Sequence, residues 1–298
     1  MSEDDETACC ASCGIAEIDD IKLKKCDGCD LVRYCSDECR ENHKSVHEED
    51  CKKRAAELRD ELLFKQPESS HMGDCPICCL PIPLGVGKAT FLWCCSKTIC
   101  LGCTCANMTR EQHQRLQPAC PFCRKSMHKV SVERDKLVMK RVKANDLNAM
   151  WQQGVREYEK GDYNSAFEYL RKAATLGSVV AHRLLAVMYE RGQGVEKDEG
   201  KASFHLEEAA IGGHPDARYD LGCHEKNINN NPGRAVRHFI IAAALGEVKS
   251  IKELIHAFRS EVISKEELDA ALRAHQDVLD AMKSPQRKIA EEILSKNS

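Results

Sequence analysis

The pattern of apolar and polar residues changes near Asn145. Beyond it, Ala, Leu, Glu, Lys and Arg dominate, a composition typical of helices. One helix is expected to begin at the capping box Ser264–Glu267 (SKEE) and to carry its apolar residues on one face. Those residues are Leu268, Leu272, His275, Leu279 and Met282. A last helix is expected to start at Ser284 and Pro285, so this half of the chain is predicted to be all-α.

The helical half contains three related copies, at residues 157–178, 188–214 and 221–247. Alanines recur inside the copies and glycines close them, both at spacings of 36 and 33 residues. They are Ala166, Ala202, Ala235, Gly177, Gly213 and Gly246. Such a period is typical of stacked helix pairs, in which small residues allow close approach and a left-handed glycine ends the second helix. Because one pair cannot bury its apolar face, the copies are expected to stack.

The middle copy, RGQGVEKDEGKASFHLEEAAIGGHPDA (191–217), resembles the Sel-one-like repeat, a relative of the tetratricopeptide repeat. The resemblance covers about 100 residues. It implies a solenoid of three repeats over 145–247, and the helices predicted over 248–298 would cap the open end of this stack. It also implies a concave surface that binds other proteins.

The first 125 residues differ because they hold 18 of the 19 cysteines. The start, MSEDDET, lacks the basic-then-apolar order of a signal peptide, and no apolar run approaches the ~20 residues of a membrane span. The chain is therefore expected to be intracellular, cytoplasmic or nuclear, where clustered CxxC pairs are typical of metal sites. A net charge of −3 predicts neither a nucleic-acid nor a membrane partner.

An acidic tail (1–8) precedes the first cysteine cluster, residues 9–51. The cluster consists of four short pairs: Cys10 and Cys13, Cys26 and Cys29, Cys35 and Cys39, His47 and Cys51. Eight ligands suffice for two tetrahedral zinc ions in closed, structural sites. Cys9 competes with Cys10, and His43 with His47. The spacings to Cys13 and Cys51 favour Cys10 and His47.

Within this cluster, RYCSDECRENHKSVHEEDC (33–51) resembles the MYND-type zinc finger. The resemblance implies interleaved pairs. One zinc ion would be held by Cys10, Cys13, Cys35 and Cys39, and the other by Cys26, Cys29, His47 and Cys51. The family usually binds short proline-containing peptides. Arg40 and Lys44 stand where it tends to have glutamine and tryptophan, which argues against that binding mode here.

Residues 52–73 are expected to form a charged helix with Leu58, Leu62 and Leu63 on one side, followed by a linker. The second cluster, 74–125, places FLWCCSKTICLGCTC (91–105) between CPIC (75–78) and CPFC (120–123). It resembles an all-cysteine RING finger, in which two zinc sites interleave. The resemblance implies one site of Cys75, Cys78, Cys100 and Cys103, and another of Cys94, Cys95, Cys120 and Cys123. Lys97 takes the place of the usual histidine, and Cys105 or His113 remain alternatives to one of the adjacent cysteines.

The predicted fold is thus two small zinc-stabilised cross-brace domains and an all-α helical-repeat solenoid, with about four zinc ions per chain. RING ligases orient a conjugating enzyme and its ubiquitin thioester, so no catalytic residue is predicted. Ile77, Pro121 and Arg124 match the family's contacts to that enzyme. Two functions remain open. One is a RING-type ubiquitin ligase whose repeats bind substrates. The other is a non-enzymatic adaptor, favoured by the lack of a tryptophan in 104–119.

Overall fold

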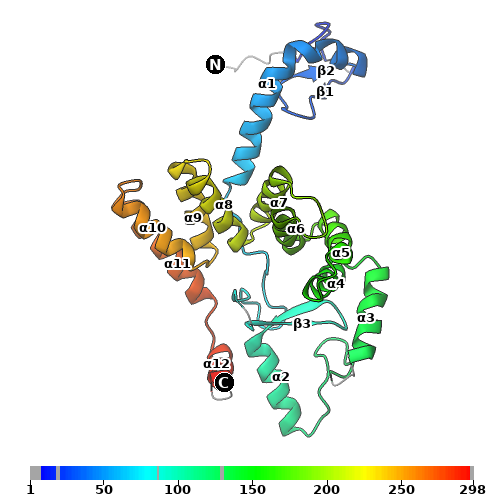
Figure 1. The fold of residues 1–298 in the computed structure, drawn as a ribbon, viewed down its shortest axis with the longest axis vertical. Coiled ribbons are helices and arrows are strands. Elements are labelled where there is room, and N and C mark those ends of the chain that lie inside the picture. Colours follow the sequence, from blue (N-terminus) through cyan, green and yellow to red (C-terminus); the bar gives the residue numbers. More distant parts are fainter. Residues whose placement is uncertain (1–7, 18–20, 86, 128–130, 296–298) are drawn as a thin grey trace. The chain divides into compact units, whose positions relative to one another are not determined.

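The computed structural model describes residues 8–17, 21–85, 87–127 and 131–295. These residues form two compact units, one that ends at Lys65 and one that begins at Gln66. Figure 1 shows the helices and strands of both units along the chain.

The first unit consists of a small antiparallel sheet, β1 (Lys24–Lys25) and β2 (Arg33–Tyr34), and a long helix, α1 (Asp37–Leu63). The helix begins at Ser36, whose hydroxyl accepts a hydrogen bond from the backbone N–H of Cys39 at 3.2 Å. It continues unbroken past residue 51, so the first cluster and the charged segment behind it share one helix. Although α1 is long, no helix among the described residues is both long and apolar enough to cross a membrane.

The second unit contains the second cysteine cluster, and we call its residues 74–127 the cysteine module. An antiparallel hairpin, β3 (Ala89–Leu92) and β4 (Lys97–Cys100), leads directly into α2 (Leu101–His113). The interior of the module consists of a few aliphatic side chains and several cysteines. So small an apolar core provides little stability by itself, which leaves a large share to metal binding.

A stack of helices follows the cysteine module (Figure 1). Its members are α3 (Ser131–Lys143), α4 (Leu147–Glu159), α5 (Tyr163–Thr175), α6 (Val179–Arg191), α7 (Glu199–Ile211), α8 (Pro215–Asn227), α9 (Pro232–Ala244), α10 (Lys249–Arg259) and α11 (Lys265–Ala281). Successive helices pack on one another, and the most extensive contacts lie within the pairs α4–α5, α6–α7 and α8–α9. This is the order of a helical-repeat solenoid, as the sequence predicts.

Small residues occupy equivalent places in the three pairs. The alanines at the predicted repeat positions, Ala166, Ala202 and Ala235, are all buried. The glycines that follow the second helices, Gly177, Gly213 and Gly246, have φ angles of 89°, 80° and 94°. A left-handed residue at this place ends the helix and turns the chain into the next pair. Both expectations about the repeats are confirmed.

The first two helix pairs share an apolar core. Leu170 of α5 is completely buried there, in one cluster with Leu185 and Met188 of α6. The helices around this core begin at polar caps. Asp162 and Ser178 each accept a hydrogen bond from a backbone N–H in the first turn of α5 and α6, respectively. Apolar burial and capping therefore specify the same helix boundaries.

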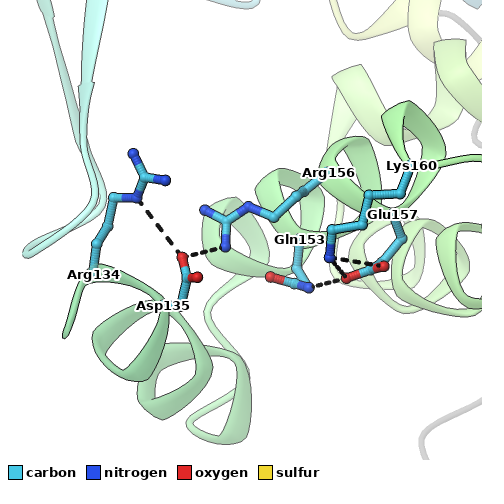
Figure 2. A network of polar contacts seen from close by, with 6 residues as sticks. All are labelled: Arg134, Asp135, Gln153, Arg156, Glu157 and Lys160. Atoms are coloured by element: carbon cyan, nitrogen blue, oxygen red, sulfur yellow. Dashed lines mark hydrogen bonds and ion pairs between the residues drawn. The ribbon is translucent and has the colours of Figure 1, made fainter. Parts of the chain in front are cut away.

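Helix α3 is an addition that the sequence pattern does not predict. Its Val138 and Val142 are buried in the core of the first helix pair. On the surface, the Asp135 carboxylate lies 2.6 Å from Nη1 of Arg156 on α4 and 3.8 Å from Nε of Arg134 on α3 (Figure 2). Exposed ion pairs contribute little to stability, so the buried valines are the main attachment of α3.

Beyond the repeats, α10 and α11 pack on α9. The predicted capping box at the start of α11 is confirmed. The Ser264 hydroxyl accepts from the Glu267 N–H at 3.2 Å, and the Glu267 carboxylate accepts from the Ser264 N–H at 2.8 Å. The last helix, α12 (Pro285–Ser295), packs instead on α2 of the cysteine module. Its predicted position on the open end of the stack is corrected, because Gly102 leaves room for α12 to approach α2 closely.

The cysteine module also contacts the start of the stack. Arg141 of α3 donates from Nε to the hydroxyl of Ser96 at 2.6 Å, and Asn148 of α4 donates to the carbonyl of Ser96 at 3.4 Å. Just ahead of the module, the His71 ring stacks on His214, with 4.1 Å between ring centroids. The module and the helices thus form one compact unit.

Candidate metal centres

Four two-cysteine turns share one backbone geometry. In each, the residue after the second cysteine has a positive φ and donates its N–H to the carbonyl of the first cysteine. These residues are Gly14 (φ 77°), Asp30 (58°), Cys79 (54°) and Arg124 (57°), with N···O distances of 2.8, 3.1, 2.8 and 3.0 Å. A turn of this form places both thiols on one side, where they can bind the same metal ion.

In the first unit, two groups of four side chains converge, each with its ligand atoms within 4.8 Å of one another. One group is Cys10, Cys13, Cys35 and Cys39, and the other is Cys26, Cys29, His47 and Cys51. Helix α1 contributes side chains to both groups. Cys39 lies in its first turn, and His47 and Cys51 lie four residues apart on one face. The groups interleave along the chain, which gives a cross-brace.

In the cysteine module, two further groups converge at the same spacing. They are Cys75, Cys78, Cys100 and Cys103, and Cys94, Cys95, Cys120 and Cys123. The tight β3–β4 turn lets the adjacent cysteines face one group. The N–H groups of Cys95 and Ser96 both donate to the Leu92 carbonyl, at 3.1 and 2.9 Å. The hairpin therefore supplies side chains to both groups of the module.

The structure also separates the candidates that the sequence left open. His47 lies with its Nε2 3.1 Å from the Cys29 sulfur, whereas Nδ1 of His43 lies 3.1 Å from the hydroxyl oxygen of Tyr34. The other candidates, Cys9, Cys105 and His113, lie outside the four groups. The structure thus brings together the sixteen side chains predicted as ligands.

The spacing of the sulfur atoms fits a tetrahedral zinc ion. With a Zn–S bond of about 2.3 Å, two sulfurs of a tetrahedron lie about 3.8 Å apart. The S···S distances are 3.6 Å for Cys13–Cys35, 3.7 Å for Cys26–Cys51, 3.8 Å for Cys78–Cys100, 3.7 Å for Cys95–Cys120 and 3.3 Å for Cys94–Cys123. A disulfide requires about 2.05 Å. Four protein ligands complete the tetrahedron, so such sites are closed and structural.

The acidity of the thiols also indicates a cation site. Burial raises the pKa of Cys10, but the backbone N–H groups of Cys13, Cys35 and Ser12 outweigh burial and lower it to about 6. The pKa of Cys75 falls to about 7 through the same balance. Neighbouring thiols raise the pKa of Cys35 to about 12. One thiolate therefore forms easily in a group, and further thiolates need a dication to offset their repulsion.

An open groove of about 600 Å³ lies beside the Cys75 group in the cysteine module. It is lined by Ile77 and Pro121 from two different cysteine turns, and by Ala106, Asn107 and Arg110 from α2. Ile77 is 43% exposed. Arg124, the third predicted contact residue, is exposed directly after the last turn. The groove thus joins two of the three predicted contact residues, without an aromatic side chain from α2.

Arg40 and Lys44, which differ from the residues usual in MYND fingers, lie on the exposed surface of α1. Arg40 forms ion pairs of 3.3 Å with both Asp27 and Asp37, and Lys44 forms one of 3.0 Å with Glu41. The surface therefore carries charge at the positions where the family resemblance predicts the wall of a proline groove.

Comparison with protein-family models finds two families in this chain. Residues 10–51 match the MYND finger model, and residues 149–178, 179–214 and 215–247 each match the Sel1 repeat model. The chain is a Sel1-repeat protein with a MYND finger. Its Sel1 repeats coincide with the pairs α4–α5, α6–α7 and α8–α9, and its MYND finger holds the first two metal groups. The MYND finger and the four groups of side chains are consistent with about four zinc sites, and Sel1 repeats indicate a capacity for protein–protein interaction.

Several solved structures are similar to this Sel1-repeat protein. A Sel1 repeat protein from Oxalobacter formigenes is 33% identical over 41% of this chain and 98% of its own, with a TM-score of 0.37. The protective antigen c5321 of uropathogenic Escherichia coli, which displays an SLR fold, is 21% identical over 49% of this chain and 34% of its own (TM-score 0.41). Immunity protein Pa5087 from Pseudomonas aeruginosa is 19% identical over 52% and 62% (TM-score 0.40). The chain thus spans about a third of c5321 and under two thirds of Pa5087. No curated protein matches the chain.

Proposed function

We propose that the cysteine module is a RING-type module that recruits a ubiquitin-conjugating enzyme, while the Sel1 repeats bind substrates. The observation that carries this proposal is the groove, in which Ile77 and Pro121 from two cross-braced turns lie together. The sixteen grouped side chains are the proposed zinc ligands. Zinc would hold the two turns at a fixed separation, and the module would act by orienting its partner.

Arg124 is the proposed contact to both the conjugating enzyme and ubiquitin. It is exposed, and its backbone is fixed in the left-handed conformation by the N–H bond to the Cys120 carbonyl at 3.0 Å. A planar guanidinium with five donors can bond two partners at once. This role requires the side chain to remain free of the metal groups, and its exposure meets that requirement.

Ubiquitin transfer tests the proposal directly. With ubiquitin, activating enzyme and a panel of conjugating enzymes, the purified chain is expected to form ubiquitin chains or to modify itself. Ile77→Ala and Arg124→Ala are each expected to slow this reaction at least about 10-fold, because interface anchors of this kind cost more than about 1.4 kcal/mol when truncated. The matched control is Met108→Ala, an exposed residue of α2 outside the groove lining.

Two results would end the ligase proposal. One is the absence of transfer with every conjugating enzyme of the panel. The other is transfer that both Ile77→Ala and Arg124→Ala leave at the wild-type rate.

A second candidate function is an adaptor without transferase activity. The observation that favours it is the α2 wall of the groove, formed by Ala106, Asn107 and Arg110, so that the aromatic contribution to the lining comes from Phe122 of the last cysteine turn and not from α2. Aromatic side chains dominate binding hot spots. In this case the assay gives no ubiquitin transfer, although the chain retains its zinc.

A further inference from the structure

The C-terminal helix α12 inserts an arginine next to a metal group. Arg287 is only 7% exposed, which is unusual for an arginine. Its guanidinium donates to the carbonyls of Pro81 at 2.8 Å, Leu80 at 3.2 Å and Met282 at 2.5 Å, and to the sulfur of Cys78 at 3.5 Å. Three of these four acceptors belong to the turn that carries Cys75 and Cys78. One side chain from the end of the chain thus fixes the first turn of the cysteine module.

The backbone of α12 is seated just as closely. A Cβ atom added at Gly102 would lie 2.9 Å from the backbone nitrogen of Arg287 and 3.0 Å from its Cα. Gly102 stands between Cys100 and Cys103 at the start of α2, so only a glycine there admits α12 at this distance. The hydroxyl of Ser284 accepts from the Arg287 N–H at 3.2 Å, which caps the first turn of α12.

Charge supports the same contact. Four thiolates around one Zn²⁺ carry a net charge of −2, and a guanidinium is always cationic in proteins. Hydrogen bonds from outer groups to ligand atoms orient the ligands and tune the affinity of a metal site. Arg287 provides a positive charge and hydrogen bonds to the ligand turn, because it reaches the Cys78 sulfur and two carbonyls of the same turn.

We propose that Arg287 is a positioning residue for zinc at the site of Cys75, Cys78, Cys100 and Cys103, and that α12 is a built-in part of the cysteine module. Ile77 precedes Cys78 in the turn that Arg287 holds. Ser284 and Gln286 line the groove together with Ile77, which remains exposed. Helix α12 thus forms a wall of the groove without covering it. The proposal does not depend on ubiquitin transfer.

Full-length Arg287→Ala, Arg287→Lys and the control Arg273→Ala, an exposed arginine of α11, test this role. Zinc release to a chromogenic chelator is followed together with amide exchange. In Arg287→Ala, about one zinc ion in four is expected to leave about 10- to 100-fold faster, the effect typical of losing an outer-shell partner. Arg287→Lys is expected to be intermediate, since lysine keeps the charge but cannot reach all four acceptors. Arg273→Ala is expected to match the wild type.

Amide exchange adds an internal control, because the N–H groups of Cys79 and Arg124 make equivalent bonds in the two turns of the module. Exchange is expected to rise at Cys79 and to stay unchanged at Arg124. The proposal would be overturned if Arg287→Ala released zinc at the wild-type rate. It would also be overturned if amide exchange rose equally at Cys79 and Arg124. If Arg287→Ala does not fold, the same two readouts on Arg287→Lys decide. A negative ubiquitin assay leaves this result unaffected, so the two proposals fail separately.

Discussion

Chelation of zinc is expected to unfold the MYND finger and the cysteine module while the Sel1 repeats keep their helices. Each structural zinc contributes about 10–16 kcal/mol of apparent binding energy to the fold that holds it. The buried core of the finger offers little else, since it consists of Tyr34 and three cysteines. Helix α1 is mostly exposed and charged, and in proteins most helical stability comes from packing of an apolar face, which α1 largely lacks. Amide exchange before and after chelation measures the effect in each segment.

The turn amides of Asp30 and Cys79 report on the two metal-bearing regions, and amides of α5 report on the repeats. The first two are expected to lose protection on chelation and to recover it when zinc is restored. Protection that persists at Asp30 and Cys79 without zinc would contradict this account. Simultaneous loss of protection in α5 would contradict the independent stability of the repeats.

Leu170→Ala is expected to destabilise the Sel1 stack by about 2–5 kcal/mol, the usual cost of truncating a fully buried leucine. Leu170 has no exposed surface and lies where the first two repeats share their core. Leu176→Ala is the matched control, because Leu176 stands at the end of the same helix and is 46% exposed. Surface changes of this kind usually stay within about 0.5 kcal/mol.

Urea unfolding of the zinc-loaded variants, followed by helical circular dichroism, measures this difference. In a solenoid, stability is close to a sum of repeat and interface contributions, so a defect at one interface weakens its neighbours. Equal midpoints for Leu170→Ala and Leu176→Ala would show that the shared core of the first two repeats does not hold the stack together.

In the proposed ligase, the second unit would hold the cysteine module and the substrate-binding repeats in a fixed relation to each other. The contacts of Ser96 with Arg141 and Asn148 fix the second cysteine group against the first helices of the stack. A substrate bound to the repeats would then be held in a defined relation to the groove. Positioning of this kind is the means by which an orienting catalyst lowers the entropic cost of transfer.

Much of the fold could be predicted because its signals are local or periodic. The repeat glycines mark left-handed helix ends, and only glycine adopts this conformation at no cost. The spacing of the cysteine pairs predicts metal ligands, and the resemblance to MYND and RING fingers implies how the pairs interleave into four groups. The choice of His47 over His43 also follows from spacing, since His47 and Cys51 share one face of α1.

The remaining features depend on tertiary contacts that leave weak signals. Helix α3 is attached through Val138 and Val142, two apolar residues within a strongly charged stretch. The position of α12 depends on Gly102, which lies far away in sequence. Arg287 binds mostly backbone carbonyls, and any residue offers a carbonyl. The local sequence signal for this contact is Gly102, a glycine between two of the proposed zinc-binding cysteines.

The two cross-braced regions are each expected to hold two structural zinc ions. Elemental analysis of the purified full-length chain tests it most directly. About four zinc ions per chain are expected, one for each of the four groups of side chains. A value near two would contradict the account, because one of the two regions would then fold without metal.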